Sequence, residues 1–175
     1  FGDQGIWYAR DRRGRAWWGG EREMALDNYV DKTKNYRRKR TLISFGAGGS
    51  WAAVRGKNGF MCSNVSEDLA ARLEGLNRAN RKVHRLSLSM QNRLGYWILD
   101  EEGSQWTNLS VDLNEELKSR RWSRRDSPQP LQVCEGHDGW LILCEDEFIA
   151  SPGIPETLGR ELAHFYEVHL ERNIA

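Results

Sequence analysis

The feature that most constrains the fold is a set of residue types that returns along the chain about every 45 residues, a spacing typical of repeat architectures. In each copy an aromatic residue precedes a turn, and an apolar column follows the turn. The recurring positions are Trp7, Trp51, Tyr96 with Trp97, and Trp140; Gly14, Gly59, Gly103 and the region of Glu147; Gly20, Val65, Leu109 and Ile154; Met24, Leu69, Leu113 and Leu158; and Asn28, Leu73, Leu117 and Leu162. These columns predict four units, at residues 1–36, 37–80, 81–126 and 127–175.

The second unit shows the expected content of each copy, which is three strands and a helix. The apolar strands are predicted at residues 41–45, 50–55 and 60–63. The first of them ends at a glycine run, which permits the positive φ angles of a tight turn. Ser66 is a candidate helix N-cap, and the stripe formed by Leu69, Leu73 and Leu76 has the spacing of a helix that lies on a sheet.

The other units repeat this order with local changes. We expect strands at 84–90 and 96–100 with a Ser110-capped helix in the third unit, strands within 131–134 and 140–150 with a helix over 154–170 in the fourth, and a hairpin over 6–20 with a weaker helix over 21–30 in the first. The stretch at 1–9 matches that at 45–53, so Phe1 falls inside a unit and we expect the natural chain to extend upstream. Terminal units of repeat proteins are commonly atypical.

A unit of this size cannot cover its apolar sheet with one short helix, so the units must stack or close into a ring. We therefore predict a single β-rich repeat domain over 1–175, α+β by content, arranged as a four-bladed propeller-like ring or an open array.

The stretches WAAVRGKNGFMCS, YWILDEEGSQWT and WLILCEDEFIA, each with its following helix, resemble haemopexin-type four-bladed propeller repeats. The disulfide that usually ties the first and last blades of that family has no counterpart here, and the Asp-Ala that opens its repeats is missing. The resemblance implies an architecture, and it carries no functional residues to this chain.

Composition narrows the function classes. Lysine and arginine number 26 against 25 acidic residues, so the net charge of +1 argues against a body that is basic throughout. The cysteines Cys62, Cys134 and Cys144 are an odd count without a CxxC pair, which favours a reducing compartment and predicts a cytoplasmic location. We expect Cys62 and Cys134 to be small buried residues. No signal-peptide or membrane-spanning pattern is present.

No constellation of residues predicts catalysis, a metal or a cofactor. The segment GAGGS at 46–50 precedes a strand, whereas a phosphate loop requires a helix directly after it. His164 and His169 fall on different faces of a helix. We expect the acidic residues in the turns around Glu102 and Glu147 to be solvated, as surface carboxylates usually are. We therefore predict a non-enzymatic protein.

Basic clusters are the first candidate binding feature. The turns of the first two units are basic and those of the last two are acidic, and each connection between units is rich in lysine and arginine. Solvated surface loops would explain this pattern, and so would a patch for an acidic partner. The candidate residues are Arg12, Arg13, Arg37, Arg38, Arg40, Arg120, Arg121 and Arg124.

Tryptophans are the second candidate feature. Trp51, Trp97 and Trp140 recur in strands and are expected in the core. The less constrained indoles are candidates for stacking on a sugar ring: Trp17, Trp18, Trp106 and Trp122. The sequons at Asn64 and Asn108 lie at predicted helix starts, where capping explains their serines.

These features predict an interaction or scaffolding module that binds a protein partner or self-associates through its charged rims and basic connections. A carbohydrate-binding, lectin-like module is the first alternative. Binding to nucleic acid or another anionic surface through the basic connections is the second.

Overall fold

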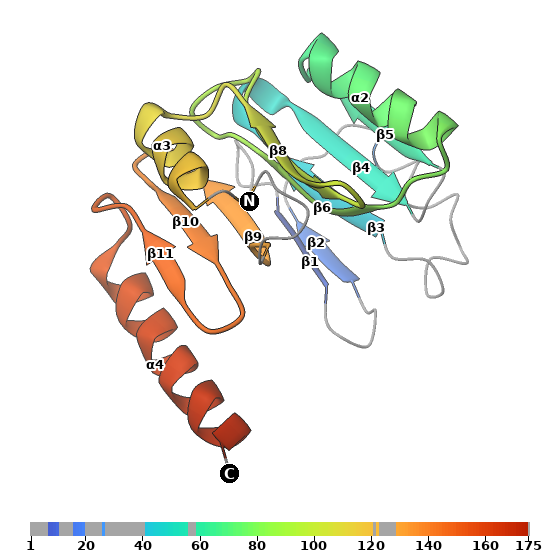
Figure 1. The fold of residues 1–175 in the computed structure, drawn as a ribbon. Coiled ribbons are helices and arrows are strands. Elements are labelled where there is room, and N and C mark those ends of the chain that lie inside the picture. The colour runs from blue at the N-terminus through green and yellow to red at the C-terminus, as the bar shows by residue number, and fades with distance from the viewer. Residues whose placement is uncertain are drawn as a thin grey trace.

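The structure is a computed structural model that describes residues 7–10, 16–19, 26, 41–55, 59–120, 122 and 129–174, with the backbone alone for 7–10, 16–19 and 168–174. Its strands and helices follow the predicted order closely (Figure 1). They are β1 (Trp7–Arg10), β2 (Ala16–Gly19), β3 (Thr41–Phe45), η3 (Ala47–Gly49), β4 (Trp51–Arg55), β5 (Phe60–Ser63), α2 (Glu67–Arg78), β6 (Val83–Leu88), β7 (Tyr96–Asp100), β8 (Gly103–Thr107), α3 (Val111–Ser119), β9 (Gln132–Glu135), β10 (Trp140–Leu143), β11 (Phe148–Ala150) and α4 (Glu156–Ile174).

The strands form separate antiparallel sheets, one for each predicted unit. The sheets β3-β4-β5, β6-β7-β8 and β9-β10-β11 each have the middle strand of the unit at their centre, and β1 pairs with β2 in the predicted hairpin. The protein is therefore β-rich, and the expected order of three strands and a helix is confirmed for the second, third and fourth units.

Local sequence explains where the helices begin. The N–H of Leu69 donates to Ser66 Oγ at 3.2 Å, so Ser66 caps α2 as predicted. Asn64 and Asn108 precede α2 and α3 with φ angles of 54° and 52°, a left-handed conformation that asparagine tolerates better than most residues. Ser110 occupies the N-cap of α3 but makes no capping bond with its side chain.

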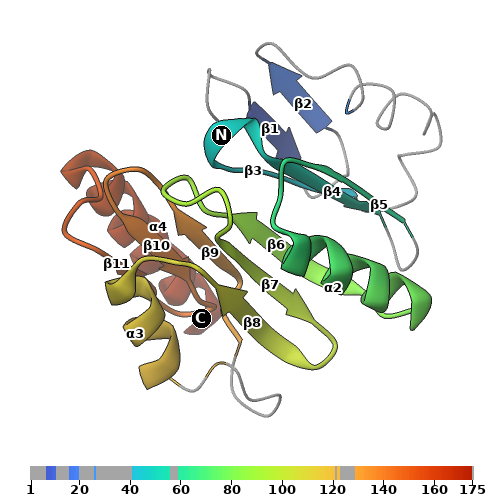
Figure 2. The ribbon, with the colours of Figure 1, turned by 90° about the horizontal axis from the view of Figure 1, so that it is seen from above.

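The helices α2 and α3 each lie between the sheet of their own unit and the sheet of the next unit. Leu69, Leu73 and Leu76 of α2 pack with Ala52 and Val54 of β4 on one side. On the other side the same leucines pack with the next sheet, through Val83, Leu86, Leu88, Tyr96 and Ile98. The helix therefore fills the wedge between two sheets (Figure 2).

The next wedge repeats this arrangement. Leu113 and Leu117 of α3 share a cluster with Trp97 of their own sheet and with Trp140 and Ile142 of the next sheet. The core positions predicted for Trp51, Trp97 and Trp140 are confirmed, since all three side chains are buried. Leu26, the described helical residue of the first unit, packs in the same way on Trp51 and Ala53 of β4, together with Phe45 of β3.

The first strands of successive units lie side by side. Ser44 Oγ accepts the N–H of Leu88 at 2.8 Å, and the Ala47 N–H donates to the Ser89 carbonyl at 2.9 Å. One unit further, the Met90 N–H donates to the Glu135 carbonyl at 3.0 Å. Gly46 fits this close approach, because a Cβ there would lie 2.7 Å from Leu88 Cβ. The units follow one another in a curved row, and the described residues do not close it into a ring (Figure 2).

One predicted equivalence is wrong. Leu69 and Leu113 are buried, whereas Leu158, at the same third position of α4, is 41% exposed. The reason is that α4 has a sheet of its own unit on one side and no described sheet on the other. Met24 and Asn28, assigned to the same columns in the first unit, lie outside the described residues.

Candidate interaction surface

The start of each buried helix is clamped to the following unit by one hydrogen bond. The Tyr96 hydroxyl donates to Asp68 Oδ2 at 2.5 Å, and the Trp140 indole N–H donates to Asp112 Oδ2 at 2.7 Å. Both acids are the second residue of their helix, both aromatics open a middle strand, and both pairs are 28 residues apart. This helix-start clamp escaped the sequence analysis, although its 28-residue spacing was the signal that could have revealed it.

The two clamps shift acid–base equilibria in the expected directions. Burial, and then the hydrogen bond to Asp68, raises the pKa of Tyr96, so its hydroxyl stays a donor. The hydrogen bond from Trp140 lowers the pKa of Asp112, because it stabilises the ionised carboxylate.

The end of each buried helix carries a second contact with the following unit. Arg81, just beyond α2, pairs with Glu102 in the β7-β8 turn. Arg120, at the C-cap of α3, pairs with Glu147 in the β10-β11 turn at 2.6 Å. Both turn acids stay about half exposed to solvent, as expected for turn carboxylates, and each also pairs with an arginine at or just beyond the end of a helix. Some of the charged residues that were predicted to lie on the rims therefore form ion pairs at these junctions.

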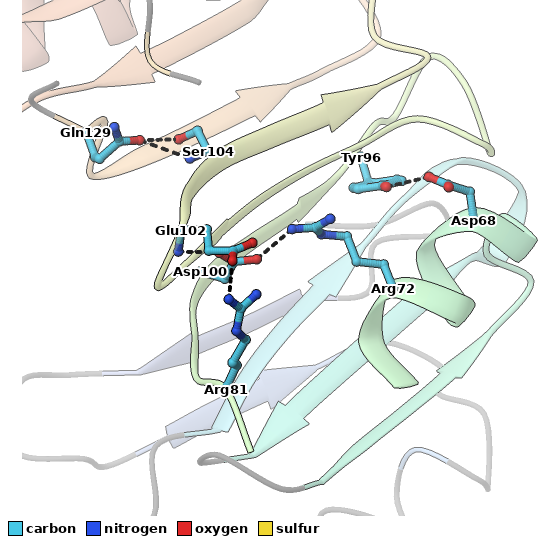
Figure 3. A network of polar contacts seen from close by, with 8 residues as sticks. All are labelled: Asp68, Arg72, Arg81, Tyr96, Asp100, Glu102, Ser104 and Gln129. Carbon is cyan, nitrogen blue, oxygen red and sulfur yellow. Dashed lines mark hydrogen bonds and ion pairs between the residues drawn. The ribbon is translucent and has the colours of Figure 1, made fainter. Parts of the chain in front are cut away.

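The junction of α2 with the third unit also contains a buried ion pair. Arg72 Nη2 lies 2.6 Å from Asp100 Oδ2, and the Asp100 side chain has no exposure to solvent (Figure 3). The other oxygen of Asp100 accepts the Glu102 N–H at 2.7 Å. The carboxylate thus joins the helix, the middle strand and its turn.

A groove of about 540 Å³ runs along this junction. Its walls include Arg72 and Arg81 from the α2 side and Tyr96, Glu102 and Trp106 from the sheet. The groove therefore combines aromatic surface with groups that donate and accept hydrogen bonds. Trp106, a predicted sugar-stacking residue, is half-buried there, with its indole N–H donating to Asn114 Oδ1 at 2.9 Å.

Trp122 does not lie on the surface as its candidate role requires. Its side chain is 5% exposed and belongs to the cluster around α3, β9 and β10. The Arg120 guanidinium carbon lies 5.7 Å from the centre of its ring. Trp122 is thus a core residue whose ring is covered on one side by Arg120, another predicted binding residue.

A second cavity, of about 520 Å³, lies between β3, β6 and β9. Phe45, Leu86 and Leu88 line it, and so does Leu158 from α4. Cys134, predicted to be buried, is exposed and lines this cavity. Its position follows from the curved row, in which side chains of the first strands face the inside of the curve.

The exposed side of α4 is the most distinctive surface of the described chain. Leu158, Leu162 and Phe165 occupy the third, seventh and tenth positions of α4, which are the positions of Leu69, Leu73 and Leu76 in α2. Phe165 is 56% exposed and Leu162 is half-buried. We call these three side chains the α4 face.

The α4 face is held in place by Tyr166, which lies one turn beyond Leu162 on the same side of the helix and whose ring packs edge-on against that of Phe165 at 5.6 Å. The Tyr166 hydroxyl donates to the Cys144 carbonyl at 2.8 Å, and its ring lies 5.7 Å from that of Phe148. Tyr166 is buried by these contacts. The α4 face is therefore presented by a helix that is anchored to its own sheet.

Several predicted candidates cannot be placed. Arg12, Arg13, Arg37, Arg38, Arg40, Arg121 and Arg124 lie outside the described residues, as do the side chains of Trp17 and Trp18. The structure brings Arg120 and Trp122 together, and Trp106 packs against the apolar cluster that contains Trp122 while also lining the groove.

Within the described residues, no group of three or more histidine, cysteine or acidic side chains is arranged to hold a metal. Burial, and then the Glu147 carboxylate, raises the pKa of the Cys144 thiol to about 11. This thiol is therefore protonated at neutral pH and is a poor nucleophile. The GAGGS segment is a turn followed by β4, with Gly48 and Gly49 at positive φ as predicted.

Among the described helices, none combines the length and hydrophobicity that crossing a lipid bilayer requires. Comparison of the chain with protein families, with curated proteins and with solved structures gives no match. The function must therefore be argued from the geometry of this chain.

Proposed function

We propose that the chain is a protein-interaction module in which a row of repeated units presents the α4 face to a protein partner. The observation that carries this proposal is the contrast between equivalent leucine stripes. The α2 stripe is buried between two sheets, whereas Leu158 and Phe165 of the α4 stripe are 41% and 56% exposed. Aligned apolar side chains exposed on an anchored helix are typical of protein interaction sites.

The architecture that we propose for the row is propeller-like. The side-by-side first strands and the helices wedged between sheets support it, as does the resemblance of the repeats to haemopexin-type blades. A closed ring would additionally require a sheet over the α4 face.

A photo-crosslinking amino acid tests the proposed surface. It is placed at Phe165 in one variant and at Glu167 in a control variant, and each is irradiated in an extract of cells that express the full chain. Glu167 is also exposed but lies two residues further on, about 200° around the helix. The proposal predicts discrete protein adducts from position 165 and few from position 167. Equal labelling at both positions, or none at position 165, would contradict it.

Carbohydrate binding is a second candidate, favoured by the groove beside Trp106. Tyr96 and Trp106 supply aromatic surface there, and Gln105 and Glu102 supply polar groups. A glycan array with the native protein and with Trp106→Ala tests it. Specific hits that the substitution removes would support it, and the absence of hits from the native protein would end it. Binding to nucleic acid stays a prediction, since most of its candidate residues lie outside the described ones.

A further inference from the structure

We infer that the groove between α2 and β8 binds a short extended peptide, which adds to β8 as a further strand and places a basic side chain near Asp68. This site goes beyond the proposed function, because none of the residues that line the groove belongs to α4. Three features support it: the outer edge of β8, the path of the groove along that edge, and the charge of the groove.

The backbone of β8 has hydrogen-bonding groups that point away from its sheet. In an antiparallel ladder, hydrogen-bonded pairs alternate with pairs that make no ladder bonds. The Ser104 N–H donates to a side chain, Gln129 Oε1, at 3.1 Å, so it points away from its cross-strand partner Leu99. Trp106 lies two residues further along β8 and has the same orientation. Its N–H and carbonyl therefore point outward, to the side on which no described strand pairs with β8.

Gln129 shows which chemistry this edge accepts. Its side-chain amide oxygen accepts both the N–H and the hydroxyl of Ser104, at 3.1 and 2.7 Å (Figure 3). An amide oxygen thus takes the place that the carbonyl of a neighbouring strand would have. The backbone of a bound peptide offers the same acceptor to the Trp106 N–H, and it offers an N–H donor to the Trp106 carbonyl.

The groove follows this edge. The consecutive residues Gln105, Trp106 and Thr107 all line it. Neighbouring side chains of a strand point to opposite faces of the sheet, and the Trp106 side chain packs against the apolar cluster around α3. The groove therefore reaches from the face that α2 covers to the outer edge of β8. A strand docked at this edge would place alternate side chains in the groove.

The wall of α2 leaves room for such a chain. Ala71 and Gly75 are one helical turn apart, and both are exposed and line the groove. A Cβ at Gly75 would meet no atom within 4 Å. The groove can therefore be filled by a larger side chain at position 75 without disturbing the packing of α2.

The α2 junction differs here from the next junction of the row. Ile142 of β10 is paired across the sheet with Ile149, which packs against the apolar cluster around α3. The equivalent residue of β7, Ile98, is paired with Gln105, which lines the groove. A polar side chain thus occupies a position where the next unit has an apolar one, and such departures from a repeated pattern are expected at functional sites.

The charges of the groove favour a basic side chain in the ligand. The two arginines that line it, Arg72 and Arg81, each form an ion pair with an acid of the third unit. Asp68 is a further acid of the groove and is exposed. It accepts the hydroxyl of Tyr96, which carries no charge, so its negative charge attracts a lysine or arginine.

Selection of a phage library of linear peptides on the purified full chain tests the site. We expect enrichment of peptides that share a lysine or arginine at a fixed position. A synthetic copy of the enriched peptide should bind Gly75→Met about tenfold or more weakly than the native protein, because the methionine side chain fills the groove. Circular dichroism checks the fold, which should persist because methionine is a better helix former than glycine.

Glu74→Met is the matched control. It places the same side chain on the neighbouring residue of α2, which is exposed and does not line the groove. The enriched peptide should bind this variant as it binds the native protein. Failure to enrich any peptide, or equal binding to Gly75→Met and the native protein, would overturn the inference. Glycan-array hits that Gly75→Met removes, without an enriched peptide, would assign the groove to carbohydrate and overturn it as well.

Amide hydrogen exchange followed by NMR tests how the peptide binds. With about 90% of the protein occupied, exchange of the Trp106 amide should slow about tenfold, because the bond to the peptide protects it in the occupied molecules. The Trp97 amide, which points away from β8, should exchange as before. A bound peptide that leaves the Trp106 amide unprotected would contradict addition to β8. Crosslinking at position 165 is a separate readout, so failure at the groove leaves the proposed α4 surface untouched.

Discussion

The helices α2 and α4 carry apolar side chains at the same three positions, yet they differ in exposure. Leu69 and Leu73 are 1% and 2% exposed, whereas Leu158 and Phe165 are 41% and 56% exposed. The pattern of each helix alone predicts burial on a sheet, and both helices do lie on the sheet of their own unit. The difference comes from the second wall of the wedge, which the next unit supplies for α2 and no described element supplies for α4.

This comparison shows that the stability of a unit is shared with its neighbour. The leucines of α2 belong to one cluster with residues from two sheets, so removing either sheet would expose them. Repeat proteins behave in this way because each unit contacts mainly the units next to it. The face of α2 that joins two units corresponds to the face of α4 that no described sheet covers.

The largest expected effect comes from truncating the same helical position in the two helices. Leu69→Ala should lower the free energy of unfolding by about 3 to 4 kcal/mol, because it leaves a cavity between two sheets. Leu158→Ala should lower it by less than about 1 kcal/mol, because its side chain already meets solvent. Urea denaturation of both variants measures the difference. Equal losses would show that the two positions have equivalent surroundings.

The buried ion pair at the α2 junction comes next. Arg72→Ala should lower the free energy of unfolding by about 2 to 3 kcal/mol, because it leaves the Asp100 carboxylate buried with fewer partners. This loss is smaller than that expected for breaking a fully buried ion pair, since Arg72 is itself partly exposed. Arg160→Ala on α4, whose pair with Glu156 is on the surface, is the matched control and should change stability little. A loss at Arg72 no larger than at Arg160 would mean that the pair does not fix the junction.

The helix-start clamp should have a smaller effect that depends on pH. Trp140→Phe removes the donor to Asp112 and should cost about 1 kcal/mol at neutral pH. The clamp lowers the pKa of Asp112 in the folded state, so its contribution is present above the ordinary aspartate pKa and is lost as the pH falls through the folded pKa.

Denaturation of the native protein and Trp140→Phe from pH 7 down to acid measures this effect. The two curves should converge on acidification. Tyr96→Phe at the other junction provides the comparison, since it removes the same kind of bond to Asp68. A penalty for Trp140→Phe that is constant across this range would show that lost packing, and not the clamp, is responsible.

The helix-end pairs should have the smallest effect. Arg81→Gln and Arg120→Gln should each change the free energy of unfolding very little, because both ion pairs are exposed to water and screened by salt. The loss should shrink further at high salt. Arg78→Gln, which breaks a pair within α2 alone, separates contacts between units from those inside a helix. A large, salt-independent loss would contradict this assignment.

The repeat period predicted much of the fold because it reflects local rules that hold in each copy. The apolar stretches at 84–90 and 96–100 located β6 and β7, and Ser66 located the start of α2. The glycine run was correctly read as a turn. Such features depend on a few neighbouring residues, which a single sequence displays in full.

The candidate site was predicted less well, because it depends on which surfaces meet. Leu158 matches the repeat pattern as well as Leu113 does. Their environments differ because no described sheet of a following unit covers Leu158. Trp122 does not recur in the other units and was predicted to be available for ligand stacking, yet it fills the core beside Arg120. The pairing of Asp112 with Trp140 requires knowledge that the start of one helix meets the middle strand of the next unit.

Hydroxyl-radical footprinting of the four stripe residues, read by mass spectrometry at low protein concentration, tests the central claim most directly. The account predicts rapid labelling of Leu158 and Phe165 and slow labelling of Leu69 and Leu73, relative to the intrinsic reactivity of each side chain. Protection of Leu158 and Phe165 to the same degree as Leu69 in the dilute monomer would contradict it, because a sheet of the same chain would then cover the α4 face.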